Sequence, residues 1–250
     1  MNASISPEPV HLQTIAVMRE AYRRELDCQI VHDSHHERGF LRSHSLLMNG
    51  VMVGYGSIDD AGTVKEFYLS PERRDVALPL FRMLLDHSRA TTIASQSNDV
   101  LLMPMMQACA TNIVAEAILF ADGEPTALTA PGAIFRRVRW YERPFVFHHT
   151  LEPRGDWAIE LDGRIVATGG LFFHYNRPFG DIYMEVAAEY RRRGLGAFLV
   201  QELKRVARDG GHVPAARCNV ENAASQATLR RAGMRPCGHI LRGLVADPTR

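Results

Sequence analysis

The sequence predicts an α+β fold, in which a mixed α/β sheet is flanked by helices, and it predicts two copies of that fold. Three observations lead to this class. Leu195, Leu199 and Leu203 recur at the spacing of one helix face, which indicates an amphipathic helix. Two runs of strand-forming residues meet at Asp162-Gly163, a pair that favours a tight hairpin turn. The same order of strands and helices then occurs in both halves of the chain.

Length and composition indicate an ordinary globular protein. The chain has 250 residues, 46% of them hydrophobic, and a formal net charge of +1. This length allows one domain or two, and the charge balance gives no support to a nucleic-acid partner. No apolar run reaches the roughly 18 residues of a membrane span, and Met1 to Val10 lacks the features of a secretion signal. We therefore expect a soluble, cytoplasmic protein with no membrane partner.

The cysteines and histidines do not form a recognisable metal site. Cys28, Cys109, Cys218 and Cys237 include no Cys-x-x-Cys pair, so neither a zinc site nor a disulfide framework is indicated. The stretch from His32 to Ser45 holds several histidines among charged residues, and we expect it to form a loop that faces water.

The first half begins with a helix and continues with strands and helices in alternation. Residue patterns and turn residues assign the elements in order. They are helix Leu12–Cys28, strands Leu46–Asn49, Val51–Ile58 and Thr63–Leu69, a helix after Pro71 with Leu80, Phe81, Leu84 and Leu85 on its apolar face, strand Thr91–Ala94, helix Val100–Cys109 capped by Asn98-Asp99, and strand Asn112–Phe120.

The second half has the same order of elements. They are the hairpin strands Trp157–Leu161 and Arg164–Phe173, strand Asp181–Val186, helix Ala197–Arg208, strand Ala215–Val220, helix Ala223–Ala232 capped by Asn222, and strand Pro236–Val245. A repeat of about 120 residues indicates a duplicated domain rather than a solenoid. We place the two domains at residues 1–140 and 141–250.

The strand that ends at Val186 leads into a loop of three arginines and two glycines, followed by a helix. Glycines such as Gly194 and Gly196 can adopt positive φ and allow close approach of a ligand to the backbone. The first N–H groups of a helix have no helical partner and lie at its positive end, and arginines add donors suited to phosphate. The pattern predicts a pyrophosphate site, and the alternative is a plain glycine turn with solvated arginines.

Known phosphate motifs narrow the choice of ligand. The loop has no Gly-Lys pair, as a P-loop requires, and Leu199 stands where a dinucleotide fingerprint has its third glycine. Arg191-x-x-Gly194-x-Gly196 instead resembles the Arg/Gln-x-x-Gly-x-Gly/Ala loop of the GNAT acetyltransferase superfamily. Downstream, Asn222-x-x-Ser225-x-x-Thr228-Leu229-x-x-x-Gly233-Met234 resembles the family's Asn-x-x-Ala/Ser-x-x-Leu-Tyr-x-x-x-Gly-Phe segment.

The resemblance implies a tandem GNAT protein, each domain having a twisted, mostly antiparallel sheet flanked by helices. At the matching position the first half has Asp75, Val76 and Ala77 instead of the glycines, so we interpret it as a degenerate copy. The resemblance also implies acetyl-CoA as the cofactor. It would be held by Met184, Val186, Arg191, Arg192, Arg193, Gly194, Leu195, Gly196, Ala197, Asn222 and Ser225.

Transfer of an acetyl group to an amine needs a base, because an ammonium has no lone pair. Glu185 and Asp181 are the candidates, since they lie on the strand where the family often places its base, with the same parity along it; His174 and Tyr175 are lesser ones. The alternative for Glu185 is a structural or surface carboxylate.

Leu229 stands where many relatives have the tyrosine that protonates the leaving thiolate. Cys218, Tyr190 or water would then be the acid, or the thiolate leaves unaided.

The acceptor is expected to be a primary amine of a small molecule or peptide, and the protein a monomer or homodimer. Arg217 would favour an anionic acceptor if it lies near the acceptor pocket, and it would be structural if it forms an ion pair in the sheet. A second function remains open, which is that of a non-catalytic acetyl-CoA-binding or protein-interaction module. The missing tyrosine and the altered first half motivate it.

Overall fold

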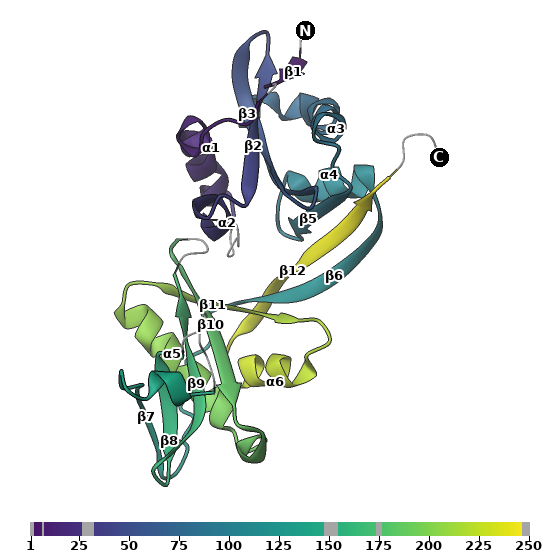
Figure 1. Ribbon diagram of the computed structural model, residues 1–250. Coiled ribbons are helices and arrows are strands. Elements are labelled where there is room, and N and C mark those ends of the chain that lie inside the picture. The colour runs from purple at the N-terminus through teal and green to yellow at the C-terminus, as the bar shows by residue number, and fades with distance from the viewer. Residues whose placement is uncertain (1–2, 7, 27–32, 148–154, 174–176, 247–250) are drawn as a thin grey trace. The chain divides into compact units, whose positions relative to one another are not determined.

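The computed structural model describes residues 3–6, 8–26, 33–147, 155–173 and 177–246. The chain forms two compact units (Figure 1). Unit 1 consists of Met1–Ala117 and Gly238–Arg250, and unit 2 of Ile118–Cys237. This division differs from the boundary expected at residue 140. The expected boundary groups the strands by their position along the chain, whereas the units are defined by contacts in space. Strand β12 (Arg235–Val245) follows the second half in sequence, yet its residues from Gly238 onward belong to unit 1.

Unit 1 is a sheet with helices on both faces (Figure 1). Its strand order is β1-β2-β3-β4-β5-β12, in which β4 and β5 are parallel and the other pairs antiparallel. Helices α1 and α2 lie on one face, and α3 and α4 on the other. The elements are β1 (Ala3–Ile5), α1 (Leu12–Arg24), α2 (Asp33–Glu37), β2 (Leu41–Met48), β3 (Val51–Asp59), β4 (Thr63–Leu69), a 3-10 turn (Pro71–Val76), α3 (Ala77–Ser88), β5 (Thr92–Gln96), α4 (Leu102–Cys109) and β6 (Ala110–Ala121), which continues into unit 2.

The sequence predicts most of these elements. In α3, for example, the apolar residues that were expected to face the core are buried there. Asp99 of the expected Asn98-Asp99 cap accepts hydrogen bonds from the N–H groups of Leu101 and Leu102, and α4 begins at Leu102 rather than at the expected Val100. Strand β1 and the early start of β2 were not predicted.

The histidine-rich stretch is not a water-facing loop, and that prediction is wrong for His36 and His44. His36 lies in α2, its side chain is 3% exposed, and its Nε2 is 3.0 Å from Oε2 of Glu66. Arg19 of α1 contacts the same carboxylate at 3.3 Å. A buried carboxylate needs charged or hydrogen-bonding partners. The contacts of Glu66 with Arg19 and His36 therefore hold α1 and α2 against the sheet. His44 is buried in β2, and His32 lies outside the described residues.

Unit 2 has the strand order β6-β11-β10-β9-β8-β7, with helices α5 and α6 next to it. Its elements are β7 (Ala133–Arg137), a 3-10 turn (Arg143–Phe145), β8 (Trp157–Leu161), β9 (Arg164–Phe172), β10 (Phe179–Val186), a 3-10 turn (Ala188–Tyr190), α5 (Leu195–Asp209), β11 (Val213–Asn219) and α6 (Ala223–Arg231). Asp162 and Gly163 have φ of 50° and 74°, which confirms the predicted hairpin turn. Strand β7, at the edge of the sheet, was not predicted.

Helix α5 is fixed in unit 2 by apolar and charged contacts. Leu199 and Leu203 are fully buried in the core, as their spacing predicts. Lys204 is 2% exposed, and its Nζ lies 3.1 Å from a carboxylate oxygen of Asp122 and donates to the main-chain oxygens of Glu124 and Ala232. The lysine therefore connects the middle of α5 to the chain after β6 and to the end of α6.

The two units repeat details of backbone and side-chain bonding. The Nε of Arg191 donates to the oxygen of Val186 at 3.0 Å, and the Nε of Arg74 donates to the oxygen of Leu69 at 3.4 Å. In each unit the strand before this arginine is paired in parallel with its neighbour over only part of its length. These equivalences confirm that the two halves are copies of one fold.

Candidate functional site

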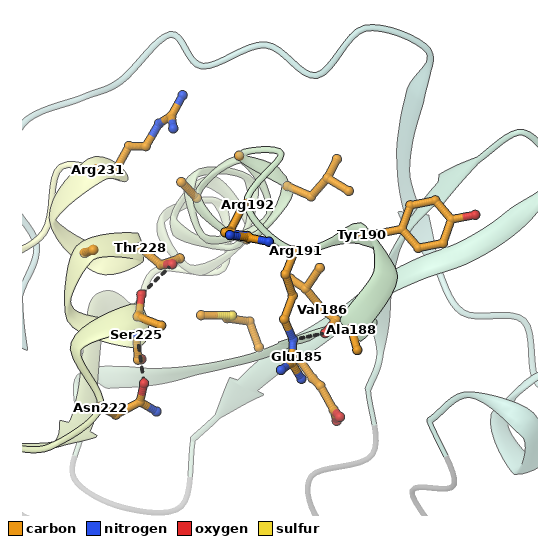
Figure 2. A pocket seen from close by; sticks show the side chains of 17 residues that line it. Glu185, Val186, Ala188, Tyr190, Arg191, Arg192, Asn222, Ser225, Thr228 and Arg231 are labelled. Carbon is orange, nitrogen blue, oxygen red and sulfur yellow. Dashed lines mark hydrogen bonds between the residues drawn. The ribbon is translucent and has the colours of Figure 1, made fainter.

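Unit 2 contains a cavity of about 730 Å³ at the N-terminal end of α5. Figure 2 shows α6 side chains along one side of it and the arginine loop with the end of β10 along the other. The lining residues are Met184, Glu185, Val186, Ala188, Tyr190, Arg191, Arg192, Gly194, Leu195, Gly196, Ala197, Asn222, Ala224, Ser225, Ala227, Thr228 and Arg231. All residues that the sequence analysis assigned to cofactor binding are among them, apart from Arg193.

One wall of the cavity is the end of β10, where this strand separates from β11. The parallel register between the two strands ends at Ile182 and Ala216. The antiparallel register with β9 continues to Val186. Met184 and Val186 therefore belong to a strand segment that is held on one side by β9 and has left β11 on the other. Such an opening can receive an extended ligand alongside a strand.

The loop between β10 and α5 bends through two residues with positive φ. These are Arg192, with φ of 62°, and Gly194, with φ of 81°. Helix α5 begins at the next residue, Leu195, so the N–H groups of the loop and of the first helical turn lie at the positive end of the helix. Alternating backbone conformations of this kind form an anion-binding concavity. A non-glycine residue at positive φ is uncommon, and nothing in the sequence pattern predicted it at Arg192.

Gly196 does not adopt positive φ, in contrast to the expectation, because it is already within α5. A Cβ at this position would lie 3.2 Å from Cγ2 of Thr228 and 3.4 Å from Cγ2 of Val186. The glycine therefore keeps α5 close to α6 and β10 at the base of the cavity, rather than turning the chain.

The three loop arginines have different roles. Arg191 donates from Nε to Val186, which fixes the loop to the end of β10 (Figure 2). The guanidinium of Arg193 lies 5.1 Å from the centre of the Tyr190 ring, a cation–π contact, and does not line the cavity. Arg192 lines the cavity directly. Among the described residues, no partner contacts the side chain of Arg192, so this arginine of the loop is available to a ligand in the cavity.

Helix α6 begins beside the cavity with the predicted cap. Oδ1 of Asn222 accepts the N–H of Ser225 at 3.0 Å, and Oγ1 of Thr228 donates to the oxygen of Ala224 at 2.8 Å (Figure 2). Asn222 thus caps α6 with its side-chain oxygen and also lines the cavity. Thr228 and Arg231 also line the cavity and were not predicted as site residues, although their spacing of four and seven residues from Ala224, which lines it too, places them on one helix face.

The two candidate carboxylates lie on one face of β10, because its register with β9 has no bulge between them. Their surroundings differ. Glu185 is exposed and lines the cavity. Asp181 is 4% exposed, and its Oδ2 lies 3.3 Å from Nε of Arg217. Burial raises the pKa of Asp181 to about 6, while the nearby arginine opposes that rise. Arg217 is therefore already paired within the sheet.

The candidate acids have equally distinct positions. Leu229 is 3% exposed and packs in the core of unit 2. Cys218 is also buried, and burial raises the pKa of its thiol. Tyr190 lines the cavity beneath Arg193. His174 and Tyr175 lie outside the described residues.

The matching loop of unit 1 is built differently. Only two residues, Asp75 and Val76, separate Arg74 from the first residue of α3, whereas three residues separate Arg191 from the first residue of α5. Arg74 also forms an ion pair with Glu25 in addition to its bond to Leu69. The positive charge of this arginine is thus neutralised by the protein itself.

Comparisons with known proteins give the following findings. Residues 126–234 match the model of the acetyltransferase (GNAT) family, and residues 11–123 match a model of an acetyltransferase (GNAT) domain. A comparison with the curated proteins found no significant match. In the described part of the chain, no helix combines the length and hydrophobicity that a bilayer span requires, and no group of three or more potential metal ligands occurs.

Solved structures share the fold over nearly the whole chain. A GNAT-family acetyltransferase from Colwellia psychrerythraea has a TM-score of 0.80 and 14% identity, with 98% of this chain and 100% of that chain covered. A tandem GNAT protein from the clavulanic acid biosynthesis pathway has a TM-score of 0.65 and 14% identity, covering 98% and 99%. A GCN5-related N-acetyltransferase from Sphaerobacter thermophilus has a TM-score of 0.61 and 14% identity, covering 98% and 96%. The predicted fold class and tandem arrangement are confirmed.

Proposed function

Because the chain belongs to the GNAT acetyltransferase family, we propose that it transfers an acetyl group from acetyl-CoA to a primary amine of a small molecule or peptide, with the chemistry in the C-terminal domain. The observation that carries this proposal is the cavity at the start of α5. It combines a strand that has left its neighbour, a loop with positive φ at Arg192 and Gly194, and a helix N-terminus. Its volume of about 730 Å³ is within the range of cofactor sites.

The residues present fit acetyl-CoA. Its diphosphate matches the N–H groups of Leu195, Gly196 and Ala197 together with the arginines of the loop. Its extended arm matches the segment Met184–Val186 and the first turn of α6, where Asn222 and Ser225 lie. A side chain at position 196 would press against Thr228 and Val186, two residues of the cavity wall, so the glycine preserves the arrangement of α5, α6 and β10 around the cavity. When bound, acetyl-CoA would supply the acetyl group as an activated thioester.

The chain itself would supply the proton acceptor and the charge stabilisation. We assign proton removal from the acceptor ammonium to Glu185, because it is exposed at the cavity. Asp181 is the second candidate on the same strand face. Main-chain N–H groups at the end of β10 would stabilise negative charge on the carbonyl oxygen. We assign no side chain to protonation of the sulfur, since a thiol pKa of about 8.5 lets the thiolate leave without an acid.

The experiment that tests the proposal compares Glu185→Gln with Glu189→Gln. Glu189 is exposed on the neighbouring 3-10 turn and does not line the cavity. Acetyl-CoA binding is measured by calorimetry, and turnover by thiol release with a panel of primary amines. We expect Glu185→Gln to bind acetyl-CoA as the wild type does and to lose roughly 100- to 10,000-fold in turnover, with Glu189→Gln unchanged.

Two results would contradict this assignment. If Asp181→Asn lowers turnover strongly while Glu185→Gln does not, the proton acceptor is Asp181. If the wild type binds acetyl-CoA and acetylates no amine in the panel, the domain is a binding module instead.

We further propose that the N-terminal domain does not bind acetyl-CoA. The shorter loop before α3 and the ion pair of Arg74 with Glu25 support this. Calorimetry should then give one acetyl-CoA per chain, and Gly196→Asp should abolish that binding, because it places a carboxylate where the diphosphate is held. A stoichiometry of two would contradict the proposal.

A further inference from the structure

Arg231, in the last turn of α6, lies against the start of α5. The Nη2, Cζ and Nη1 atoms of its guanidinium are 3.5, 3.7 and 3.8 Å from the position that a Cβ of Gly194 would occupy. Gly194 is the positive-φ residue that leads into α5, and both residues line the cavity. The side chain thus extends from α6 to the edge of the anion loop.

No protein group neutralises Arg231 within the described ranges of the chain, where its guanidinium forms neither an ion pair nor a hydrogen bond. The neighbouring arginines are used differently: Arg191 bonds to the main chain and Arg193 covers a tyrosine ring. Arg230, the preceding residue of α6, lies over the Phe120 ring at 5.8 Å. Arg192 shares with Arg231 the property of lining the cavity without such a contact. Two uncompensated guanidinium groups and a helix N-terminus therefore surround one hollow, which favours a ligand with several negative charges.

We propose that Arg231 completes the diphosphate site from α6, so that the diphosphate is held between the main-chain N–H groups of the α5 loop and the guanidinium of Arg231. This inference rests on the proposed binding of acetyl-CoA to unit 2. It adds a residue outside the arginine-glycine loop to the binding site, and it gives α6 a part in recognising the charged portion of the ligand. Arg231 is assigned to the diphosphate rather than to the 3′-phosphate because its guanidinium lies next to Gly194.

Calorimetric titration of Arg231→Gln and Arg230→Gln with acetyl-CoA tests the proposal. Both variants remove one charge from the same turn of α6, but only Arg231 lines the cavity. We expect the Kd to rise about 10- to 100-fold in Arg231→Gln and to stay near the wild-type value in Arg230→Gln, since a charged hydrogen bond to phosphate is lost in the first variant alone. Arg231→Lys should be intermediate, because lysine keeps the charge without the forked donors.

Two truncated ligands identify the phosphate. Dephospho-CoA retains the diphosphate and lacks the 3′-phosphate, so Arg231→Gln should weaken its binding by the same factor as that of CoA. S-acetylpantetheine lacks both groups, so its use as an acetyl donor should be unaffected by the substitution. If the effect of Arg231→Gln disappears with dephospho-CoA, the residue binds the 3′-phosphate and the diphosphate assignment is wrong.

The outcome also separates this inference from the proposal on which it rests. If the wild type binds acetyl-CoA and Arg231→Gln binds it equally well, the role of Arg231 is refuted and the cofactor site stands. If the wild type does not bind acetyl-CoA, the proposed function itself fails. Unchanged tryptophan fluorescence and melting temperature of the variants establish that α6 remains folded.

Discussion

Asp181 should make unit 2 less stable at neutral pH than in weak acid. Its carboxyl is 4% exposed, and burial raises its pKa from 3.8 to about 6. Between these two pH values the folded chain keeps a proton that the unfolded chain has released, so the free energy of unfolding falls as the pH rises through this range. A difference of about two pKa units corresponds to roughly 3 kcal/mol, fully expressed above pH 6.

Replacement by asparagine removes this titration while keeping the size of the side chain. Asp181→Asn should therefore gain stability relative to the wild type as the pH rises from 4 to 7, by up to about 3 kcal/mol in total. Both tryptophans, Trp140 and Trp157, lie in unit 2, so urea unfolding followed by tryptophan fluorescence reports on the correct unit. The exposed carboxylate of Asp209 provides a control, and Asp209→Asn should follow the wild-type curve.

A constant difference between Asp181→Asn and the wild type across this pH range would refute the reasoning. It would mean that Arg217, whose Nε lies 3.3 Å from the carboxylate, holds Asp181 ionised in the folded chain despite its burial.

Three further perturbations probe other features. Gly194→Ala should cost about 1–2 kcal/mol in urea unfolding, because φ of 81° is unfavourable for alanine, whereas Gly210→Ala, at φ of −82°, should not show this cost. Lys204→Met should destabilise unit 2 by about 2–4 kcal/mol, since it leaves the main-chain oxygens of Glu124 and Ala232 without their buried donor, whereas Asp122 keeps its ion pair with Arg208; a loss below 1 kcal/mol would contradict this. Deletion of residues 238–250 should abolish the hydrogen-exchange protection of β5 (Thr92–Gln96), which pairs with Ile240–Leu244; retained protection would show that β5 is stable without β12.

Local patterns in the sequence predicted several backbone features around the cavity, because each pattern depends on neighbouring residues. The Asn222 cap and the positive φ of Gly194 are properties of short segments, and both are present as expected. Arg192 lines the cavity, but its backbone conformation was not predicted, since arginine has no intrinsic preference for positive φ. Arg231 was not placed at the cavity from the sequence, because its position there depends on how α6 packs against α5, which no local pattern encodes.

Features that join distant parts of the chain could not be predicted in the same way. His36 was expected to face water, and it is buried because Glu66, thirty residues away, needs a partner on the sheet. The division into compact units differs from the boundary expected at residue 140 for a related reason, as strand β12 pairs with β5 of unit 1. Strand β7 lies at a sheet edge and carries Arg136 and Arg137, so its composition gave a weak strand signal.

The pairing of β12 with β5 has a consequence for biosynthesis. Residues Ile240–Leu244 leave the ribosome only after the whole of unit 2 has been translated, yet they form the strand next to β5 in unit 1. Unit 1, whose first strands are translated first, can therefore complete its sheet only after unit 2 has been translated. Until then β5 presents an open edge, which is a template for pairing with other chains. A nascent chain stalled before Gly238 would thus be the species most in need of a chaperone.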